Sequence, residues 1–394
     1  MRERSIIHLN VADFAVAVER VVDRRLQDRP VIVAPDGAVR ATVYDMSDEA
    51  YQSGVYKGMP LKHALRRCRD AVVLPVHFDR YERAMADLFK HSLPYSPLVE
   101  IADHNGHVFL DATGTGRLFG PPPDIAWRIR KSVRADMGVD PIWSVAPNKL
   151  IAKVATRLVK PLGEYIVREG EETSFLNPLP MHFIPGIDKG ELMRLREFNL
   201  NRVEQVAALT LAQLDVMVGR RSHDFFDLVR GIDPSPVVPV GEKQPVVRVD
   251  HEFGDDTNSK NLVERTLFHL VEKAGAQLRR RKLAARRVGI LIDYSDGRRV
   301  ARQASAKPAL NNDFYLFPVA ALALKRAWTR RVRIRHLRLM CDRLIPPPAQ
   351  MELFPECQKE KQQHEKLINT IDSIRSRFGE TAICRGGYFS KAFC

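Results

Sequence analysis

The sequence predicts an α+β protein of several domains, and two observations carry that prediction. Strand-like and helix-like segments alternate up to about residue 165, whereas short helices with Pro-Gly turns follow from Leu179. A Pro-rich stretch without periodicity, residues 234–245, then precedes a segment that reads β-α-β-β-α-β. A chain of 394 residues is long enough to bury two to four cores.

The first 165 residues combine short apolar runs with amphipathic stretches. The apolar runs predict strands, and they are SIIHLNV (5–11), PVIVAP, AVVLPV and PIWSVAPN. The segment VEIADHNGHVFLD (99–111) predicts a hairpin that turns at Asn105-Gly106. Helical spacing appears in DFAVAVERVVDRRL, DRYERAMADLFKHSL, PPDIAWRIRKSVRADMG and NKLIAKVATRLVKP.

The remaining chain changes character twice. The boundaries that follow are 1–165, 166–233 for the helical part, 234–245 for the linker, 246–345 for the β-α-β-β-α-β part and 346–394 for the tail. In the β-α-β-β-α-β part, a strand is predicted at VRIRHLRLMCDRL, which would place Arg331, Arg333 and Arg335 on one face. The tail is expected to be mobile up to about residue 365.

The charge of this chain is concentrated in one segment. The formal net charge is +14, from 62 basic and 48 acidic residues. Between Arg279 and Arg343 there are 18 Lys or Arg and four acidic residues, so the rest of the chain is balanced at 44 of each. A local excess of this size favours a surface that binds nucleic acid over a generally basic, solvated face.

No run approaches 18 apolar residues, and the first residues lack the apolar core of a signal peptide. Five scattered cysteines include no CxxC motif and no His spacing suited to zinc, although Cys384 and Cys394 could pair on oxidation. The sequence therefore predicts a cytoplasmic protein, and its basic segment predicts association with the nucleoid.

Three motifs, in this order along the chain, resemble the Y-family translesion DNA polymerases of the DinB and UmuC (impB/mucB/samB) group. They are GVYKGMPLKHALRRC (54–68), similar to the finger segment; APNKLIAKVATRLVKPLG (146–163), similar to APNKxLAKxASxxxKPxG; and LPMHFIPGI (179–187), similar to the entry into the thumb. The resemblance spans residues 5–354 and implies a palm, fingers, a helix-hairpin-helix thumb and a little finger.

The family's nucleotidyl transfer requires two magnesium ions held by carboxylates. The resemblance places these carboxylates on the first strand and as an Asp-Glu pair on the hairpin. Here Asn10 stands at the first position, and Gly106 and His107 stand at the pair. A neutral amide and a glycine are poor ligands for magnesium, so the sequence predicts no catalytic residues and no metal or other cofactor.

Two alternatives stay open at this site. Nearby acids, namely Asp13, Asp103 or Asp111, could substitute for the missing carboxylates, in which case Mg²⁺ would be the cofactor. Asp111 is instead expected to cap or hydrogen-bond within the DATGTG turn. His107 could ligate a softer metal or could simply be exposed on the hairpin.

The residues that grip the triphosphate in the family are also replaced. Asp48 and Tyr51 occupy the positions of a tyrosine and a cation, and Ala15 replaces the aromatic gate against ribose. Lys160, which matches the family's phosphate-contacting lysine, is retained and is a candidate phosphate ligand; a solvated lysine at a helix end is the alternative. This combined loss resembles the ImuB-like, non-catalytic branch of the family.

The basic segment provides the predicted DNA contacts, which should be largely independent of base sequence. They are Arg279, Arg280, Arg281, Lys282, Arg286, Arg287, Arg298, Arg299, Arg302, Arg331, Arg333 and Arg335. The turn at Pro185-Gly186 and the helix after it are expected to add backbone N–H contacts to phosphate, although Asp188 stands where the motif usually has its second glycine.

The tail carries AQMELFPE, which has the place and form of a bacterial sliding-clamp-binding peptide. Leu353 and Phe354 would fill an apolar pocket, Met351 matches the motif, and Gln350 would fix the register. The last segment has an apolar stripe from Leu367 to Phe378, which suits either a partner-binding helix or one packed on its own body.

These observations predict a DNA-binding, clamp-binding homologue that recruits a catalytic polymerase or an accessory mutagenesis protein in translesion synthesis. The competing prediction is a diverged but active polymerase. An RNA-binding regulator would share the basic segment but would leave the clamp-like peptide unexplained.

Overall fold

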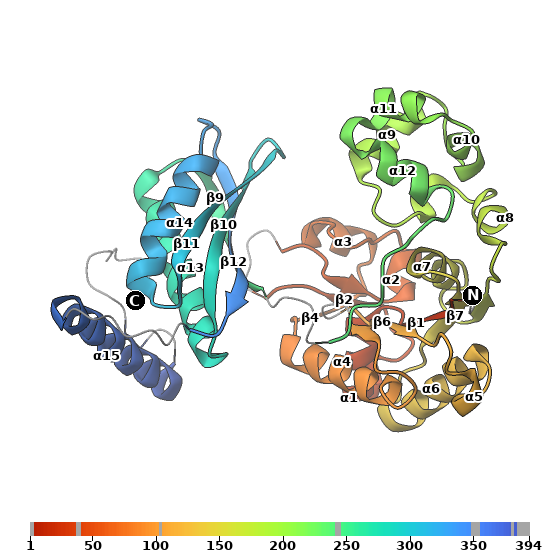
Figure 1. Ribbon diagram of the computed structural model, residues 1–394, viewed down its shortest axis with the longest axis horizontal. Helices are drawn as coiled ribbons and strands as arrows, with labels where there is room; N and C mark the ends of the chain where they lie inside the picture. Colours follow the sequence, from red (N-terminus) through yellow and green to blue (C-terminus); the bar gives the residue numbers. More distant parts are fainter. Residues whose placement is uncertain are drawn as a thin grey trace. The chain divides into compact units, whose positions relative to one another are not determined.

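The computed structural model describes residues 4–36, 41–101, 105–240, 246–347, 355–379 and 382–383, without the side chains of residues 189 and 355–362. The chain divides into two compact units, Met1–Glu242 and Lys243–Cys394 (Figure 1). The division falls inside the linker predicted over residues 234–245. However, Val237 is buried in the core of the first unit, and the Val240 N–H donates to the carbonyl of Val99. The first part of this linker therefore belongs to unit 1.

The palm of unit 1 is built on a five-stranded sheet in the order β5-β6-β1-β7-β8. Its strands are β5 Val99–Ile101, β6 His107–Asp111, β1 Ile6–Asn10, β7 Ile142–Ala146 and β8 Glu164–Ile166. The central strand β1 pairs antiparallel with both β6 and β7, and β8 runs parallel to β7. The predicted hairpin over 99–111 is confirmed by the pairing of β5 with β6.

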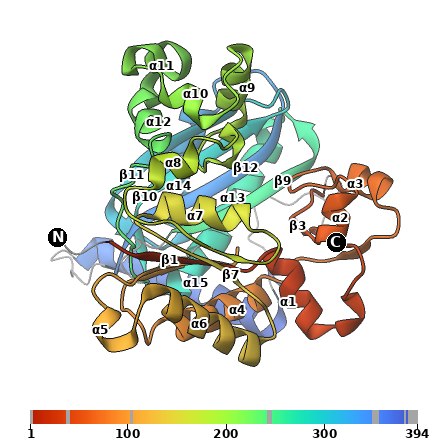
Figure 2. The same ribbon diagram turned by 90° about the vertical axis from the view of Figure 1, so that its right-hand side faces the viewer.

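Both faces of this sheet are covered, so β1 is buried along its whole length. Ile7 and Leu9 pack on one face with the helices α1 (Phe14–Val22), α4 (Phe78–Ser92) and α6 (Pro122–Met137). The other face of β1, which carries Ile6, lies under α7 (Lys149–Leu158), as Figure 2 shows. Because side chains alternate along a strand, His8 and Asn10 share this second face.

A small second core forms the fingers. Three short strands pair in the order β3-β2-β4, with bounds β3 Asp45–Met46, β2 Val31–Val33 and β4 Val72–Leu74. Two helices flank them, α2 Asp48–Gln52 and α3 Leu61–Arg67. Ile32, Met46 and Met59 are among the apolar side chains buried between these elements. The fingers therefore place the segment after β3 beside the start of α1.

The thumb is a cluster of short helices, as the Pro-Gly turns predict. They are α8 Glu172–Leu176, α9 Lys189–Glu197, α10 Val203–Ala207, α11 Leu211–Val218 and α12 Ser222–Leu228. The remaining short helices of unit 1 are α5 Gly116–Phe119 and the 3-10 turns η1 Arg24–Leu26, η2 Met181–Phe183 and η3 Gly219–Arg221. Leu195, Val206, Leu214 and Phe225 share one core with α7, which attaches the thumb to the palm.

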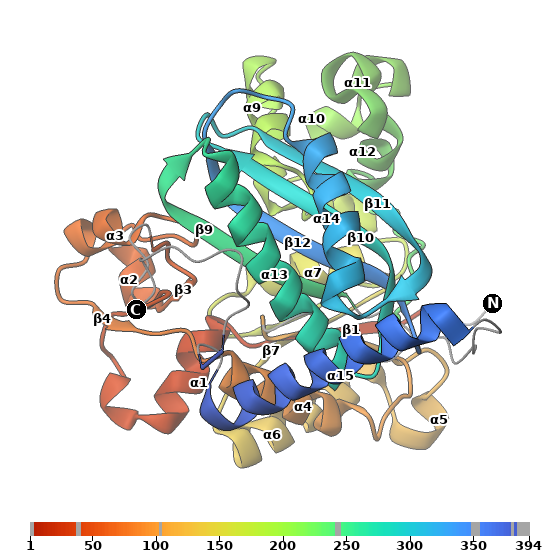
Figure 3. The same cartoon turned by 90° about the vertical axis from the view of Figure 1, so that its left-hand side faces the viewer.

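Unit 2 has the β-α-β-β-α-β order that the sequence predicts. Its elements are β9 Val247–Thr257, α13 Lys260–Arg280, β10 Ala284–Tyr294, β11 Arg299–Leu310, α14 Asp313–Ala327 and β12 Ile334–Ile345. The sheet is antiparallel in the order β11-β10-β12-β9, and α13 and α14 cover one of its faces (Figure 3). The prediction of an α+β multidomain protein is confirmed.

One strand boundary differs from the prediction. Strand β12 begins at Ile334, so Arg331 and Arg333 precede it and the alternation argument for their common face was wrong. The chain before Ile334 instead forms a connection from α14, and the carbonyl of Arg333 accepts a hydrogen bond from the N–H of Ser295. That bond brings this connection to the turn between β10 and β11.

The tail forms the helix α15 (Pro355–Phe378). Ile368 and Ile371 are buried against unit 2, whereas Leu367 and Phe378 are 49% and 74% exposed. The Arg279 guanidinium of α13 forms two hydrogen bonds with Asp372 of α15, at 2.7 and 3.0 Å. Of the two alternatives for the apolar stripe, the structure shows a helix packed on its own unit.

None of the helices in the part of the chain that the structure describes is both long enough and apolar enough to span a bilayer. The described cysteine side chains, Cys68 and Cys341, are buried and unpaired.

Candidate functional site

Asn10 lies at the end of the central palm strand, where the resemblance places the first metal-binding carboxylate. It pairs across the sheet with His107 on β6 and with Ile142 on β7. Its side chain is 1% exposed, and its Nδ2 atom has no hydrogen-bond partner among the described residues. A buried amide in this position is neutral, and both N–H donors of its NH2 group are unsatisfied within the described part of the chain.

Gly106 begins the return strand in a left-handed conformation, with φ of +74°. A Cβ atom added there would lie 2.9 Å from the Cβ of Phe14 and 2.9 Å from the carbonyl oxygen of Val11. Both the backbone angle and the close approach therefore require glycine. An aspartate at this position would need the hairpin to shift away from α1, so the change from the family pattern is structural as well as chemical.

His107 is not simply exposed on the hairpin. Its Nδ1 atom lies 3.0 Å from Nε2 of His8, and the two rings are stacked with centroids 5.1 Å apart. On its other side, Nδ1 of His8 lies 2.9 Å from the hydroxyl of Thr156 on α7. Because that hydroxyl donates to the carbonyl of Lys153, it accepts from His8 Nδ1–H, and His8 Nε2 then accepts from His107. The three side chains form one directional chain of hydrogen bonds.

Both imidazoles in this chain are held neutral. Burial, together with the charges of Lys153, Lys160, Lys57 and Arg157, lowers the pKa of His107 to about 3. Burial and the neighbouring His107 lower the pKa of His8 well below its ordinary value. The sequence analysis did not identify His8 or Thr156 as site residues. Only His8 gave a signal, because it is a polar residue inside an apolar strand, two positions before Asn10.

The residues present do not fit a pair of magnesium ions. Asn10 is neutral, Gly106 offers no side chain, and His107 is already bonded to His8 and surrounded by cations. No group of three or more His, Cys, Asp or Glu side chains that could hold a metal ion occurs within the described ranges. Ligation of a softer metal by His107 therefore stays a prediction, with His8 as its neighbouring imidazole.

The three candidate substitute acids lie in different places. Asp13 is the N-cap residue of α1, in a left-handed conformation with φ of 45°, and burial and Asp45 raise its pKa to about 6. Asp111 lies at the opposite end of β6 from His107, opposite Ile6, and accepts a hydrogen bond from the Thr113 N–H at 2.9 Å. Its predicted turn-forming role is confirmed. Asp103 lies outside the described residues.

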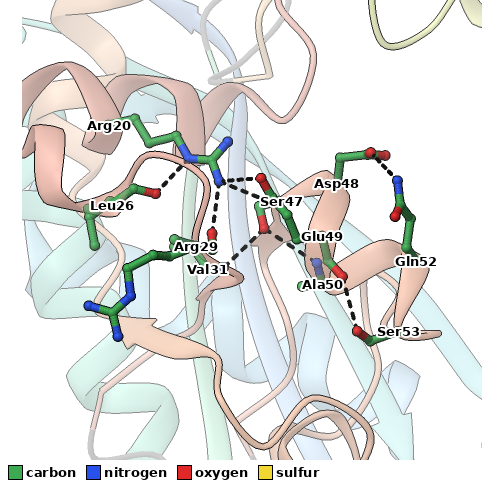
Figure 4. Close-up of polar contacts among 10 residues, drawn as sticks. All are labelled: Arg20, Leu26, Arg29, Val31, Ser47, Asp48, Glu49, Ala50, Gln52 and Ser53. Carbon is green, nitrogen blue, oxygen red and sulfur yellow. Dashed lines mark hydrogen bonds and ion pairs between the residues drawn. The ribbon is translucent and has the colours of Figure 1, made fainter.

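The finger segment that would grip a triphosphate is engaged with the protein itself (Figure 4). Arg20 of α1 donates to both carboxylate oxygens of Glu49 on α2, at 3.0 and 2.9 Å. Asp48 accepts a hydrogen bond from the Gln52 side chain at 2.6 Å, and Tyr51 is 59% exposed. Neither residue supplies a positive charge, so α2 offers no cationic grip for phosphate.

Lys160 follows α7, beside the start of α1. Lys160 is exposed, but the protein atoms around it partly desolvate its ammonium group and so lower its pKa. The negative charges of Asp13 and Asp45 oppose this lowering. A sequence-based prediction missed Asp45, which is buried and forms an ion pair with Lys57 at 2.7 Å. The phosphate-binding role of Lys160 stays a prediction.

The thumb hairpin keeps its turn glycine, because Gly186 has φ of +86°. The helix after it, α9, begins in a capping box in which Asp188 accepts from the Glu191 N–H and Glu191 accepts from the Asp188 N–H. Arg221 then pairs with Glu191 at 2.8 Å. These internal carboxylates use backbone donors that the sequence prediction assigned to phosphate contacts.

The predicted DNA-binding cations of unit 2 fall into two sets. The first set is paired within the protein: Arg279 with Asp313 and Asp372, Arg287 with Asp342, Arg299 with Asp293, Arg335 with Asp256, and Arg302 with the carbonyl of Ala301. The Arg279 side chain is only 13% exposed. Its position is better explained by the attachment of α15 than by contact with DNA.

The second set is exposed and forms no side-chain hydrogen bond or ion pair with the described part of the chain. Its members are Arg280, Arg281, Lys282, Arg286, Arg298, Arg331 and Arg333. The first four, here called the helix-end cluster, lie where α13 ends and β10 begins. The other three, the turn cluster, lie beyond the far end of β10, about 30 Å away along its 11 residues.

The clamp-like peptide, with Gln350, Met351, Leu353 and Phe354, lies outside the described residues. Its flanks are described: β12 ends at Ile345 and α15 begins at Pro355, both in unit 2.

The fold and the palm geometry define a protein of polymerase-like architecture whose metal-binding positions are altered. Residues 9–157 match the impB/mucB/samB family, and residues 247–353 match the C-terminal domain of that family. A DNA polymerase IV of Dehalococcoides mccartyi (strain CBDB1) is 30% identical over 387 residues, which cover 98% of each chain. A DNA polymerase IV of Alkalilimnicola ehrlichii is 32% identical over 313 residues, 79% of this chain and 88% of that one.

Solved structures show the same architecture. A Y-family DNA polymerase chimera of Dbh and Dpo4 has a TM-score of 0.73 at 20% identity, covering 86% of this chain and 99% of that chain. An insertion ternary complex of the Dbh DNA polymerase has a TM-score of 0.63 at 20% identity, with the same coverage. The chain belongs to the impB/mucB/samB family of Y-family DNA polymerases.

Because His107 is held neutral, the stability of the folded protein should depend on pH, and a His107 variant should change that dependence. His107 stays neutral in the folded protein down to about pH 3 but takes up a proton near pH 6.5 when unfolded, so its contribution to stability falls as the pH drops below 6.5. At pH 5 the loss is about 2 kcal/mol relative to pH 7.5. Between pH 7.5 and pH 5, the free energy of unfolding of His107→Gln should therefore fall by about 2 kcal/mol less than that of wild type. Urea unfolding at the two pH values measures this difference.

The control is His63→Gln, which alters an exposed histidine of α3 and should leave the pH profile unchanged. Asp13 has the opposite effect: because its pKa is raised to about 6, the folded protein gains stability as the pH falls through 6 and Asp13 takes up a proton. This contribution is the same in wild type and in both variants, so it cancels in the comparison. Equal pH profiles for wild type and His107→Gln would contradict the assignment of a neutral, buried pair.

Proposed function

We propose that this protein is a non-catalytic, ImuB-like Y-family homologue that binds DNA and the bacterial sliding clamp and recruits a catalytic polymerase, or an accessory mutagenesis protein, to damaged templates. One observation carries the proposal. On a polymerase-like fold, His107 stands at a position where the family holds a metal ligand, and it forms a neutral hydrogen-bonded chain with His8 and Thr156 near the cations of α7.

The electrostatics of the cleft supports this proposal. Two divalent cations need several carboxylates to offset their charge and replace their water ligands. Here the same cleft has Lys153, Lys160 and Arg157 around His107, so it repels cations. Because Gly106 cannot accept a side chain without a backbone shift, a single substitution would not restore the ligand set.

The diverged active polymerase remains the second candidate, and a specific feature favours it. Asp13 and Asp45 interact strongly enough for Asp45 to raise the pKa of Asp13, so two carboxylates do lie together near the palm. Asp45 is already paired with Lys57, which leaves little negative charge for a metal.

Primer extension separates the two candidates. With a primer-template, the four deoxynucleoside triphosphates and either Mg²⁺ or Mn²⁺, we expect no templated incorporation, because the palm lacks charged ligands for the ions. Contaminating polymerases are excluded with Asp13→Ala, Asp103→Ala and Asp111→Ala preparations. Incorporation by wild type that any of these substitutions abolishes would show that the protein is an enzyme.

DNA binding is proposed to rest on the helix-end and turn clusters of unit 2. Their separation of about 30 Å corresponds to about nine base pairs, so one duplex can reach both. Arg279, Arg287, Arg299 and Arg335 are left out of this surface because carboxylates of unit 2 already hold them. Binding of this kind would place the protein at the nucleoid.

Removing free cations should change the salt dependence of DNA binding. We expect Arg281→Ala with Lys282→Ala, or Arg331→Ala with Arg333→Ala, to weaken binding equally across DNA sequences. The slope of log K against log salt should fall by about 0.9 for each phosphate that the variant no longer neutralises. Fluorescence anisotropy at several salt concentrations measures both quantities.

The matched control is Arg287→Ala with Arg299→Ala, which removes the same charge from two arginines that already pair with Asp342 and Asp293. This control should change the salt slope less than either variant of the exposed clusters. If wild-type affinity does not respond to salt, or if the paired control has the larger effect, then the DNA surface lies elsewhere.

Clamp binding is proposed from the peptide that contains Leu353 and Phe354. We expect Leu353→Ala with Phe354→Ala to abolish binding to a purified bacterial sliding clamp and to leave DNA affinity unchanged, because only these side chains would fill the apolar pocket. The control is Glu352→Ala, at the motif position without a preference. Surface plasmon resonance with immobilised clamp measures the binding; a double variant that still binds would rule this peptide out.

A further inference from the structure

Asp45 is a buried carboxylate whose oxygens are both occupied by the protein. The residue lies in β3 of the fingers and is 2% exposed. Its Oδ2 atom accepts a hydrogen bond from the backbone N–H of Ala15 at 2.9 Å. Its Oδ1 atom accepts from its neighbour's N–H, that of Met46, at 3.0 Å and from the Lys57 ammonium group at 2.7 Å.

The Ala15 contact lies in the first turn of α1. The first N–H groups of a helix have no partner inside the helix, and the aligned peptide dipoles favour a negative charge there. The N-cap residue of α1, Asp13, forms no side-chain capping bond, and the first turn contains no acidic residue. A carboxylate from a different element, thirty residues further along the chain, therefore supplies the anion at this helix end.

The surroundings match those of a phosphate group. A helix N-terminus and nearby lysines are the usual partners of phosphate, and here they are α1, Lys57 and Lys160. Lys160 is also the residue that the family resemblance assigns to phosphate. The charge of Asp45 raises the pKa of both Asp13 and Lys160, so these charged groups lie near one another. Asp45 thus lies among the groups that would hold a triphosphate.

We propose that Asp45 is a built-in anion that takes the place of a nucleotide phosphate at the start of α1, so that the protein excludes polyphosphates even before any metal is considered. The inference rests on the proposed function and extends it: the non-catalytic palm would already fail at nucleotide binding. The same principle operates at α9, where Asp188 and Glu191 occupy the first backbone donors of the thumb hairpin. The proposal itself concerns only α1.

The test measures binding of inorganic tripolyphosphate by isothermal titration calorimetry, with a chelator present and without DNA. Wild type should show no saturable binding up to millimolar concentration. Asp45→Ala frees the Ala15 N–H and Lys57, and we expect its affinity to be at least about ten-fold higher than that of wild type. Adding Lys57→Ala to this variant should remove the gain.

The matched control is Asp87→Ala, which removes an equal charge from α4 in the same unit. Asp87 forms an ion pair with Lys90 at 2.8 Å, so this change should leave tripolyphosphate binding at the wild-type level. Near-UV circular dichroism and urea unfolding verify that each variant is folded. If Asp45→Ala does not fold, Asp45→Ser keeps a small hydrogen-bond acceptor for the Ala15 N–H, removes the charge and should gain affinity in the same way.

Two results overturn the inference: a folded Asp45 variant that binds no better than Asp87→Ala, or a wild-type protein that binds tripolyphosphate as tightly as the Asp45 variant. Neither result bears on polymerisation. A wild type that binds polyphosphate but extends no primer overturns this inference alone, whereas a wild type that extends primers overturns the proposed function.

Discussion

The hydrogen-bonded chain from His107 through His8 to Thr156 is the interaction on which the palm of this protein depends. In the proposed function, contacts between these neutral groups take the place of contacts between carboxylates and metal ions. Because His8 is buried and His107 is half-buried near lysine and arginine side chains, protonating either imidazole would add a positive charge among cations. Protonation of these side chains would therefore destabilise this part of the palm.

The hairpin and the helices around this chain are adjusted to it. Gly106 allows the return strand to approach α1 closely, which places His107 directly opposite Asn10 on β1. Thr156 reaches His8 because α7 covers that face of the sheet. The substituted positions are thus parts of one packed arrangement, and that explains why the polymerase fold persists around them.

Internal carboxylates satisfy other groups that would meet phosphate in a nucleotide- or DNA-bound polymerase. Asp45 holds the first turn of α1 and Lys57, and Asp188 with Glu191 holds the first turn of α9. In unit 2, acidic residues pair with several of the arginines that the sequence assigned to DNA, and the exposed members of that predicted set form the helix-end and turn clusters.

Local sequence patterns determined much of this protein. The β-α-β-β-α-β order of unit 2, the hairpin over residues 99–111, the short helices of the thumb and the altered positions Asn10, Gly106 and His107 all follow from periodicity, turn residues and motifs. Such signals are local because propensity and alternation act over a few residues. Element boundaries were less well determined: β12 begins only at Ile334, so the strand alternation predicted for Arg331 and Arg333 does not apply.

Only the tertiary structure decided which charges meet. His8 finds Thr156 148 positions away, Asp45 finds Ala15 30 positions away, and Arg279 finds Asp372 93 positions away. No pattern along the chain encodes these pairs, because each depends on how separate elements pack. The sequence alone therefore predicted that Asn10, Gly106 and His107 replace the carboxylates expected from the family, whereas the fold showed which groups these residues contact.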